Sequence, residues 1–425
     1  MRKTNPIKIV LIVASLALIA GLIYQLPPVK SRLSWRLEFA FTYLRGIAQP
    51  ARPAPTPVLS TADPSNEKPL AVIPTSSQLP TLTPSLPNLT STRGPTFTPS
   101  PTPTPIPVSV KLPNPAYEAQ TMNNCGPATL TMYLRLFGWN GDQTTIAEVI
   151  KPVKEDRNVN VDELVYYVRN HAGWLSAEFR VGGTIERLKL ILAAGMSVMV
   201  EEGVDLGQSY WPNDDQWGGH YLLLTGYDDA QKFFWVQDSF RPKIKAVAYT
   251  DVDTKWQQFN RVYIMIYLPT QESTLQNILG SDWDKDANRQ HALDAAKAET
   301  TAMPQNPFTW FNLGSNLVYF DRYDEAAAAY DKARQIGLPQ RMFLYQFGPF
   351  LAYFNTYRNA DLLAITEYVL NLPSHPKSEE PLLWHGWALV RKGDREGAIA
   401  DFKEALQIHP GYQDALYALN YLGSS

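Results

Sequence analysis

The stretch Asn123-Asn124-Cys125-Gly126-Pro127-Ala128-Thr129-Leu130 determines how the central part of this chain is interpreted. Cys125 is the only cysteine in 425 residues, so it cannot form an intramolecular disulfide. The apolar run that follows predicts a helix over residues 126–137, with the thiol at its N-terminus. Unpaired backbone N–H groups and the helix dipole favour a thiolate in that position. Cys125 is therefore either a small core residue or a nucleophile.

A cysteine nucleophile needs a base, and the base needs a group that orients it. Of the six histidines, only His171 and His220 fall in the same globular segment as Cys125. His171 ends a predicted helix, where a histidine stabilises the C-terminus. His220 begins a predicted strand over residues 220–227 and is the candidate base.

A turn at residues 228–231 separates this strand from a second one at 232–238. Pairing Tyr227 with Lys232 would place His220 opposite Ser239, and a small register change would bring Asp238 beside the imidazole. An aspartate there would hold the ring in one tautomer. The alternative is an ordinary hairpin with a polar end.

Three parts of this chain together resemble the bacteriocin-processing peptidases: the segment from Gln120 to Ala128, the strand from Gly219 to Asp228, and Asp238. These form family thirty-nine of the papain-like cysteine peptidases, here in a stand-alone form. The resemblance spans about residues 110–270. It implies Cys125 as nucleophile, His220 as general base and Asp238 as orienting group. It also implies Gln120 as an oxyanion-hole donor.

Two features depart from the family pattern. Ser239 stands where the family often has proline, and Gln120 lies five residues before Cys125, one fewer than the papain-like norm. The side chain of Asn124 and the backbone N–H of Cys125 are therefore alternative oxyanion donors. The founding members are fused to transporters and cleave after a double glycine, but this chain contains no GxxxxGK[ST] phosphate-binding loop.

Local patterns predict an α+β fold for residues 111–270, with helices followed by antiparallel strands. The helices are expected at 126–137, 145–150, 161–170 and 185–194, and the strands at 197–201, 220–227, 232–238, 244–248 and 261–268. Loop 203–219 is a candidate substrate-binding rim. We interpret Asp214 and Asp215 as solvated side chains and Asp282, Asp284 and Asp286 as an acidic helix start, so no metal or cofactor is predicted.

The N-terminus carries Arg2, Lys3 and Lys8, followed by an uncharged apolar run over residues 9–26. That is close to the ~20 residues that span a bilayer. Residues 1–28 are therefore predicted to form a single-pass anchor in the cell membrane. The N-terminus would be cytoplasmic and the folded domains extracytoplasmic. A cleaved signal peptide is the alternative.

Residues 29–48 mix aromatic and aliphatic side chains with arginines. They predict a juxtamembrane helix that either lies on the outer membrane face or packs as an extension on the folded part. Residues 49–110 are rich in proline, serine and threonine. They predict an extended spacer that holds the folded part away from the membrane.

After a helical joint at residues 271–305, residues 306–425 show the pattern of tetratricopeptide repeats. Gly314, Gly348 and Gly386 are spaced by 34 and 38 residues, close to the repeat length. The middle unit is degenerate, and residues 411–422 are expected to form a capping helix. Such arrays bind peptides or partner proteins on a concave face; the alternative is that the repeats only brace the peptidase-like domain.

The formal net charge of −3, without a basic stripe outside the N-terminus, argues against nucleic-acid binding. The leading hypothesis is a membrane-anchored, extracytoplasmic cysteine peptidase that uses a Cys–His–Asp triad on a peptide or protein substrate. The same thiol could instead serve acyl transfer. A third hypothesis is a non-catalytic surface scaffold that binds peptides.

Overall fold

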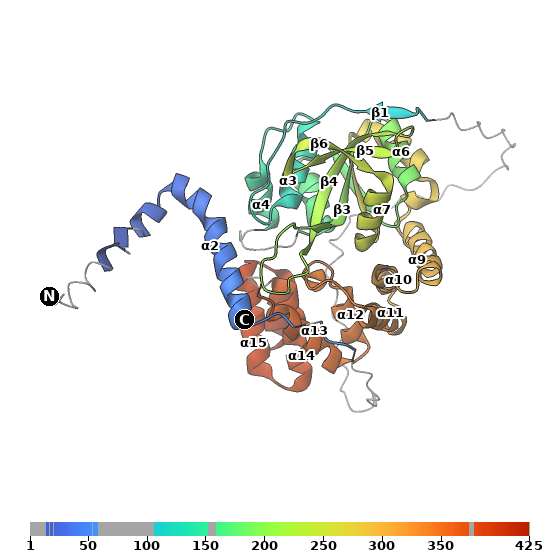
Figure 1. The fold of residues 1–425 in the computed structure, drawn as a ribbon. Helices are drawn as coiled ribbons and strands as arrows, with labels where there is room; N and C mark the ends of the chain where they lie inside the picture. The colour runs from blue at the N-terminus through green and yellow to red at the C-terminus, as the bar shows by residue number, and fades with distance from the viewer. Residues whose placement is uncertain are drawn as a thin grey trace.

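The computed structural model describes residues 14–16, 18–19, 21–52, 54–57, 106–151, 159–373 and 378–424. Within them, an antiparallel sheet with helices on both faces lies beside an array of paired helices, and a long N-terminal helix runs down one side (Figure 1).

The sheet has the strand order β2-β7-β3-β4-β5-β6, and the short β1 pairs with the end of β4. Each of these neighbouring pairs is antiparallel. The strands are β1 (Ser109–Lys111), β2 (Ser176–Arg180), β3 (Val198–Asp205), β4 (Trp217–Asp228), β5 (Phe233–Asp238), β6 (Arg241–Ala248) and β7 (Tyr263–Tyr267).

Helices bury both faces of this sheet, which explains the long apolar run of β4. Because successive side chains of a strand point to opposite faces, Tyr221 and Leu223 pack in one core and Leu222 and Leu224 in the other. The first core lies under α3 (Cys125–Arg135), α4 (Gln143–Ile150) and α5 (Val161–His171). The second lies under α6 (Ile185–Ala193), α7 (Tyr249–Trp256) and α8 (Glu272–Leu279).

The first turn of α3 packs closely against β4 at Gly126. A Cβ atom on Gly126 would lie 3.3 Å from Val159 and 3.4 Å from the ring of Tyr221. Thr129 adds a hydrogen bond from its hydroxyl to the Tyr221 carbonyl at 3.2 Å. These contacts fix the helix that begins at Cys125 against the strand that carries His220.

The predicted helices and strands of this domain are all present, with ends displaced by a few residues. The sequence analysis did not predict β1, β2 or α7. The acidic helix start is confirmed, since Asp284 caps α9 (Lys285–Ala302) by accepting a hydrogen bond from the backbone N–H of Ala287 at 2.9 Å.

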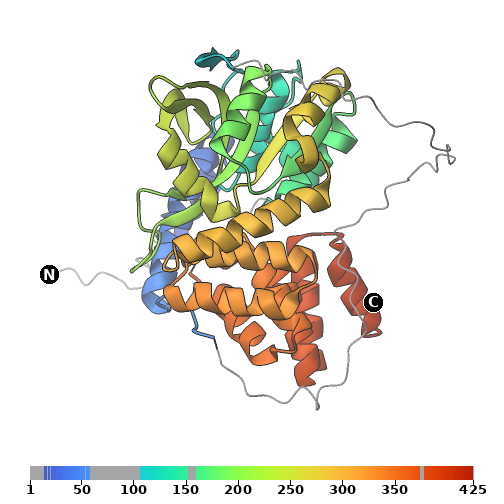
Figure 2. The same ribbon diagram turned by 90° about the vertical axis from the view of Figure 1, so that its right-hand side faces the viewer.

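Paired helices follow α9, which lies at the junction of the two parts (Figure 2). They are α10 (Pro307–Tyr319), α11 (Tyr323–Ile336), α12 (Gly348–Asn355), α13 (Asn359–Leu370), α14 (Glu379–Lys392), α15 (Arg395–Ile408) and α16 (Gln413–Tyr421). Close helix crossings explain the repeated glycines, because a Cβ atom on Gly386 would lie 2.5 Å from the ring of Phe402. The degenerate middle unit corresponds to the short α12, which follows a 3-10 turn at Met342–Leu344.

The predicted juxtamembrane segment forms most of α2 (Pro27–Ala48), and one side of this helix packs on the folded part. Phe39 meets Tyr210 edge to face at 5.5 Å, and Arg45 Nε donates to the Pro373 carbonyl at 3.3 Å. The sequence left two alternatives for this segment, lying on the membrane face or packing on the folded part. The side of α2 that carries Phe39 and Arg45 packs on the folded part. None of the described helices is long and apolar enough to cross a bilayer, and part of the predicted run 9–26 lies outside the described residues.

The loop between β3 and β4 joins the sheet domain to the repeats. Asp214 accepts two hydrogen bonds from the guanidinium of Arg341, at 2.6 and 2.7 Å, and both side chains are at most 2 % exposed. The same guanidinium lies 3.9 Å from the ring centroid of Trp211. The interpretation of Asp214 as a solvated side chain was therefore wrong. Asp215 is partly exposed and accepts from the backbone N–H of Gln340 at 2.6 Å.

Arg341→Ala should lower the free energy of unfolding by about 3–5 kcal/mol, because it leaves the Asp214 carboxylate buried without its partner. The matched control is Arg322→Ala, which removes an exposed Arg322–Glu325 pair and should leave the free energy of unfolding nearly unchanged. Urea unfolding of both variants measures the difference. Equal losses would show that the loop is not held by this ion pair.

Candidate active site

Cys125 is the first residue of α3 and is partly buried. The loop before it is fixed by Lys151, whose Nζ donates to the Asn123 carbonyl at 2.7 Å. Asn123 has a left-handed backbone with a φ of 59°, a conformation that asparagine adopts more readily than most residues. The thiol is thus held in a defined turn at a helix N-terminus, as the sequence predicted.

Gln143 braces the same loop from the first turn of α4. Its Oε1 accepts from the backbone N–H of Thr121 at 2.7 Å and from Asn124 Nδ2 at 3.2 Å, while its Nε2 donates to the Ala119 carbonyl at 2.7 Å. The sequence analysis missed this residue, because a glutamine in a helix's first turn resembles any polar helix start.

His220 lies on β4 and is 5 % exposed. Its Nε2 is 2.9 Å from Asp238 Oδ1. Asp238 also accepts from the backbone N–H of Phe240 at 2.8 Å and from Lys245 Nζ at 3.2 Å. With its carboxylate so positioned, Asp238 accepts a hydrogen bond from Nε2–H, and Nδ1 remains the nitrogen that can serve as a base.

The predicted hairpin register was wrong, although Asp238 and His220 do meet. Tyr227 pairs with Phe234 rather than Lys232, and an irregularity between Leu224 and Gly226 shifts the pairing so that Asp238 faces Leu222. Lys232 lies in the turn with a φ of 57°. His220 lies two residues before Leu222 on the same face of β4. Asp238 therefore contacts His220 diagonally across the two neighbouring strands.

The charges of this cluster favour a thiolate beside an imidazolium. Burial by itself would raise the pKa of the Cys125 thiol, but the hydrogen bond and charge of His220, together with the charge of Lys151, bring that pKa below its ordinary value. Burial would likewise lower the pKa of His220, but its hydrogen bonds to Asp238 and Cys125 raise it instead. Burial opposes the charge of Asp238 too, yet its bonds to His220 and the Phe240 N–H hold its pKa below the ordinary value.

Gln120 is tied to the residue that follows Asp238. Its Oε1 accepts from the Ser239 hydroxyl at 2.9 Å, and its backbone N–H donates to the Ser239 carbonyl at 2.9 Å. The serine that departs from the family pattern therefore positions Gln120, which a proline side chain could not do. Because its oxygen is engaged, the amide NH₂ of Gln120 is the end left to donate. Asn124 donates its Nδ2 to Thr121 and Gln143, so its amide is committed within the loop.

Two buried glutamates of β3 border the site and were not predicted. Glu201 faces Tyr221 across the strand pair, and Glu202 faces His220. Burial, with the nearby Cys125 charge, raises the pKa of Glu201 well above its usual range. Burial also raises the pKa of Glu202 to about 7, against the opposing charge of His220. The sequence analysis missed both residues because two adjacent acids at the end of a predicted strand usually are exposed to solvent.

The other described histidines have different surroundings. His171 stacks on Tyr167 at 5.1 Å between ring centroids. Those in the joint and the repeats each pair with a carboxylate: His291 with Asp282, His385 with Asp401 and His409 with Glu379. His375 lies outside the described residues. In the part of the chain that the structure describes, no group of three or more His, Cys, Asp or Glu side chains could hold a metal ion.

Sequence comparison relates this domain to known peptidases. Residues 109–267 match the model of the Peptidase C39 like family. The match covers less than half of the chain and contains Cys125, His220, Asp238 and Gln120. No curated protein matches the chain.

The chain is also similar to several solved structures. A C39-like peptidase from Bacillus anthracis is 18% identical, with 37% of this chain and 96% of that chain covered and a TM-score of 0.29. Xylellain, a cysteine protease from Xylella fastidiosa, is 15% identical over 39% of this chain and 87% of its own, with a TM-score of 0.31. YrrB, a tetratricopeptide protein with an unusual peptide-binding site, is 17% identical over 36% of this chain and 76% of its own, with a TM-score of 0.28.

Glu202→Gln should change the pH dependence of stability. The pKa of Glu202 is raised from 4.5 to about 7 in the fold, so the folded state favours the protonated acid. Its contribution to the free energy of unfolding is complete below pH 4.5 and is lost as the pH rises through 7, by roughly 3 kcal/mol. The free energy of unfolding of the variant should therefore rise relative to that of the wild type by that amount between about pH 4 and pH 8.

The free energy of unfolding of wild type and variant, measured with urea at both pH values, provides the test. Glu148→Gln, on the exposed side of α4, is the matched control and should change stability by less than about 0.5 kcal/mol. A gain for Glu202→Gln that is the same at both pH values would contradict the burial of an ionisable Glu202.

Proposed function

We propose that this protein is a cysteine peptidase whose triad is Cys125, His220 and Asp238. The observation that carries the proposal is the chain of contacts at the start of α3. His220 lowers the pKa of the Cys125 thiol through a hydrogen bond and its charge, and its Nε2 lies 2.9 Å from Asp238. A nucleophile, a base and an orienting group in this order constitute the usual machinery of acyl transfer.

In the proposed reaction, the Cys125 thiolate attacks the carbonyl carbon of a peptide bond. The developing oxyanion would be stabilised by the Cys125 backbone N–H and the amide of Gln120. The His220 imidazolium then gives its proton to the leaving amine, and a thioester remains on Sγ. A water molecule loses a proton to the neutral His220 and attacks the thioester, and expulsion of the Cys125 thiolate releases the carboxylic acid and restores the thiolate–imidazolium pair.

Substrate selection would involve the loop between β3 and β4, since it ends at the strand that carries His220. The loop is also bound to the repeats through Asp214 and Arg341. We propose that the repeats recruit a peptide or protein partner. We also propose that residues 9–26 anchor the chain in the cell membrane with the folded part outside the cytoplasm, as the basic start before the apolar run favours.

The active thiol can be tested with a cysteine-directed, peptide-like electrophile on the full-length chain. Labelling of Cys125 should be rapid at about pH 6, where an ordinary thiol with a pKa near 8.5 is almost wholly protonated. His220→Ala should slow it by roughly 10²–10⁴-fold, because the imidazolium that stabilises the thiolate is lost. His171→Ala is the matched control and should label at the wild-type rate.

Peptide products give the second readout of this prediction. Peptides incubated with the wild type should be cut with the addition of water, as mass spectrometry detects, whereas joined peptides would indicate acyl transfer to an amine. Cys125→Ser should give no product. Hydrolysis that persists in Cys125→Ser, or slow labelling that is equal in wild type and His220→Ala, would refute the proposed mechanism.

Deletion of residues 9–26 should move the protein from the membrane fraction of expressing cells to the soluble fraction, because the apolar run is the proposed anchor. The deleted chain should still label at Cys125, since α3 and β4 are untouched. An equally long deletion within residues 58–105 is the matched control and should leave the protein in the membrane fraction. Retention of both deletions in the membrane fraction would contradict the anchor.

A further inference from the structure

The stretch that follows α2 lies against the repeats. Ala51 and Ala54 pack against the apolar core of the repeat helices, whereas Arg52 and Thr56 are exposed. Pro57 is again partly buried. Of the six described positions in this stretch, 51, 54, 55 and 57 are partly buried, so most of the described residues lie against the repeats. We call the stretch 51–57, of which the structure describes residues 51–52 and 54–57, the docked segment.

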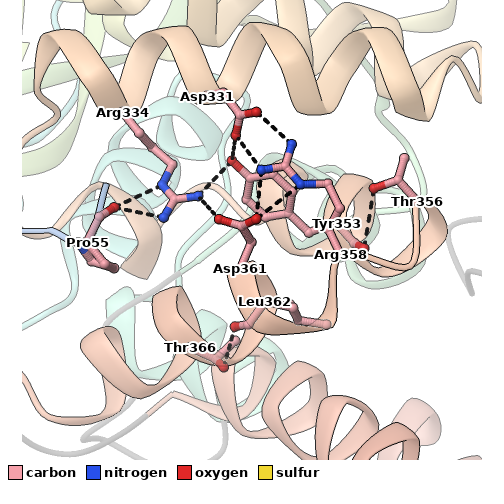
Figure 3. A network of polar contacts seen from close by, with 9 residues as sticks. All are labelled: Pro55, Asp331, Arg334, Tyr353, Thr356, Arg358, Asp361, Leu362 and Thr366. Atoms are coloured by element: carbon pink, nitrogen blue, oxygen red, sulfur yellow. Dashed lines mark hydrogen bonds and ion pairs between the residues drawn. The ribbon is translucent and has the colours of Figure 1, made fainter. Parts of the chain in front are cut away.

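A single arginine of the repeats binds the backbone of the docked segment. Arg334 of α11 donates from Nε and Nη2 to the Pro55 carbonyl oxygen, at 3.2 and 2.7 Å. Figure 3 shows its guanidinium between Pro55 and Asp361, which accepts from Nη1 at 3.1 Å. The hydroxyl of Tyr353 accepts from the same nitrogen at 2.9 Å.

The position of Arg334 is determined by a buried polar network inside the repeats. Its side chain is 1 % exposed, as is that of Asp361. Asp361 also pairs with Arg358 at 2.7 Å, and Arg358 pairs with Asp331 at 2.6 Å (Figure 3). The charges of the two arginines and the two aspartates cancel. The contacts among them hold the Arg334 guanidinium in place independently of the docked segment.

Within the described residues, the acceptor for Nε and Nη2 of Arg334 is the Pro55 carbonyl. Without the docked segment, these buried N–H groups would lack that acceptor, which is energetically costly for a charged donor. The repeats thus present a preformed donor for a backbone carbonyl, flanked by an apolar surface that holds alanine side chains.

We propose that the repeats contain a binding site for an extended, alanine- and proline-rich peptide, and that residues 51–57 of the same chain are its resident ligand. The sequence Gln49-Pro-Ala-Arg-Pro-Ala-Pro-Thr-Pro57 suits this site. Its prolines lack N–H donors and favour an extended backbone, so little conformational entropy is lost on binding. Its alanines fit close to the repeat helices, and its carbonyls remain free to accept.

Binding of the docked segment to the repeats would shorten the reach of the proline-rich linker. At the other end of that linker, the Pro107 carbonyl accepts from the Tyr227 hydroxyl at 2.6 Å, and β1 joins β4. Both ends of residues 58–105 are therefore attached to the folded part while the segment is docked. Only release of the segment would let residues 49–105 act as the long spacer that the sequence predicted. This inference does not depend on peptidase activity.

Thiol labelling of two single-cysteine variants tests the proposal on the full-length chain. Both carry Cys125→Ser, which removes the native thiol; one adds Ala54→Cys and the other Thr56→Cys. Because residue 54 packs on the repeats and residue 56 is exposed, Ala54→Cys should label at least about tenfold more slowly. Equal labelling rates would overturn the proposal.

A synthetic peptide with the sequence of residues 49–59 then tests the site itself. At millimolar concentration it should compete with the tethered segment, whose effective concentration is of that order, and speed the labelling of Ala54→Cys but not of Thr56→Cys. The control peptide has glutamate in place of both alanines and should have no effect. Failure of the alanine peptide to speed labelling would overturn the proposed binding site.

Arg334→Lys tests the arginine, since it keeps a positive charge beside Asp361 but loses the planar pair of donors. Added to the Ala54→Cys variant, it should raise the labelling rate severalfold toward that of Thr56→Cys. Thermal unfolding of the same protein checks that the repeats remain folded. A folded Arg334→Lys variant with unchanged protection of residue 54 would overturn the role of Arg334.

Discussion

The contact of His220 with Asp238 is the interaction on which the site depends. A buried imidazolium beside a thiolate is stable only if a carboxylate compensates its desolvation, and Asp238 is held in place for this by a backbone N–H and Lys245. The contact itself results from the irregular pairing of β4 and β5, which brings the carboxylate diagonally beside the ring. The start of α3, which packs on Tyr221 of β4 and is bonded to its carbonyl by Thr129, then supplies the thiol.

The strand that carries His220 also links the site to the repeats. Trp217, at the start of β4, stacks on Phe259 at 5.8 Å and meets Tyr345 edge to face at 5.6 Å. A Cβ atom on Gly219, the residue before His220, would lie 2.9 Å from the Tyr345 ring. With the buried Asp214–Arg341 pair, these contacts give the repeats a packed connection to the rim of the site. α2 touches the same rim through Tyr210, so three distant parts of the chain meet beside the proposed catalytic histidine.

Much of the domain could be predicted because its signals are local. A lone cysteine at a helix start, a histidine opening an apolar strand and glycines at the repeat spacing each act through neighbouring residues. The errors concern partners far away in sequence. Asp214 looked solvated because Arg341 is 127 residues distant, and residues 51–57 looked like free spacer because Arg334 is 279 residues from Pro55. The hairpin register failed because nothing in the sequence reveals an irregularity at Leu224 and Gly226. Glu202 was missed because its burial depends on the pairing of β3 with β4.

The ionisation of Cys125 tests the central claim most directly. The ultraviolet absorbance of the thiolate can be followed against pH in the wild type, with Cys125→Ser as the blank that removes the tyrosine background. The account predicts that the thiolate appears at a pH clearly below that of a free cysteine, and that Asp238→Asn shifts its appearance to higher pH. A thiolate that appears only near pH 8.5 in both proteins, as in a free cysteine, would contradict it.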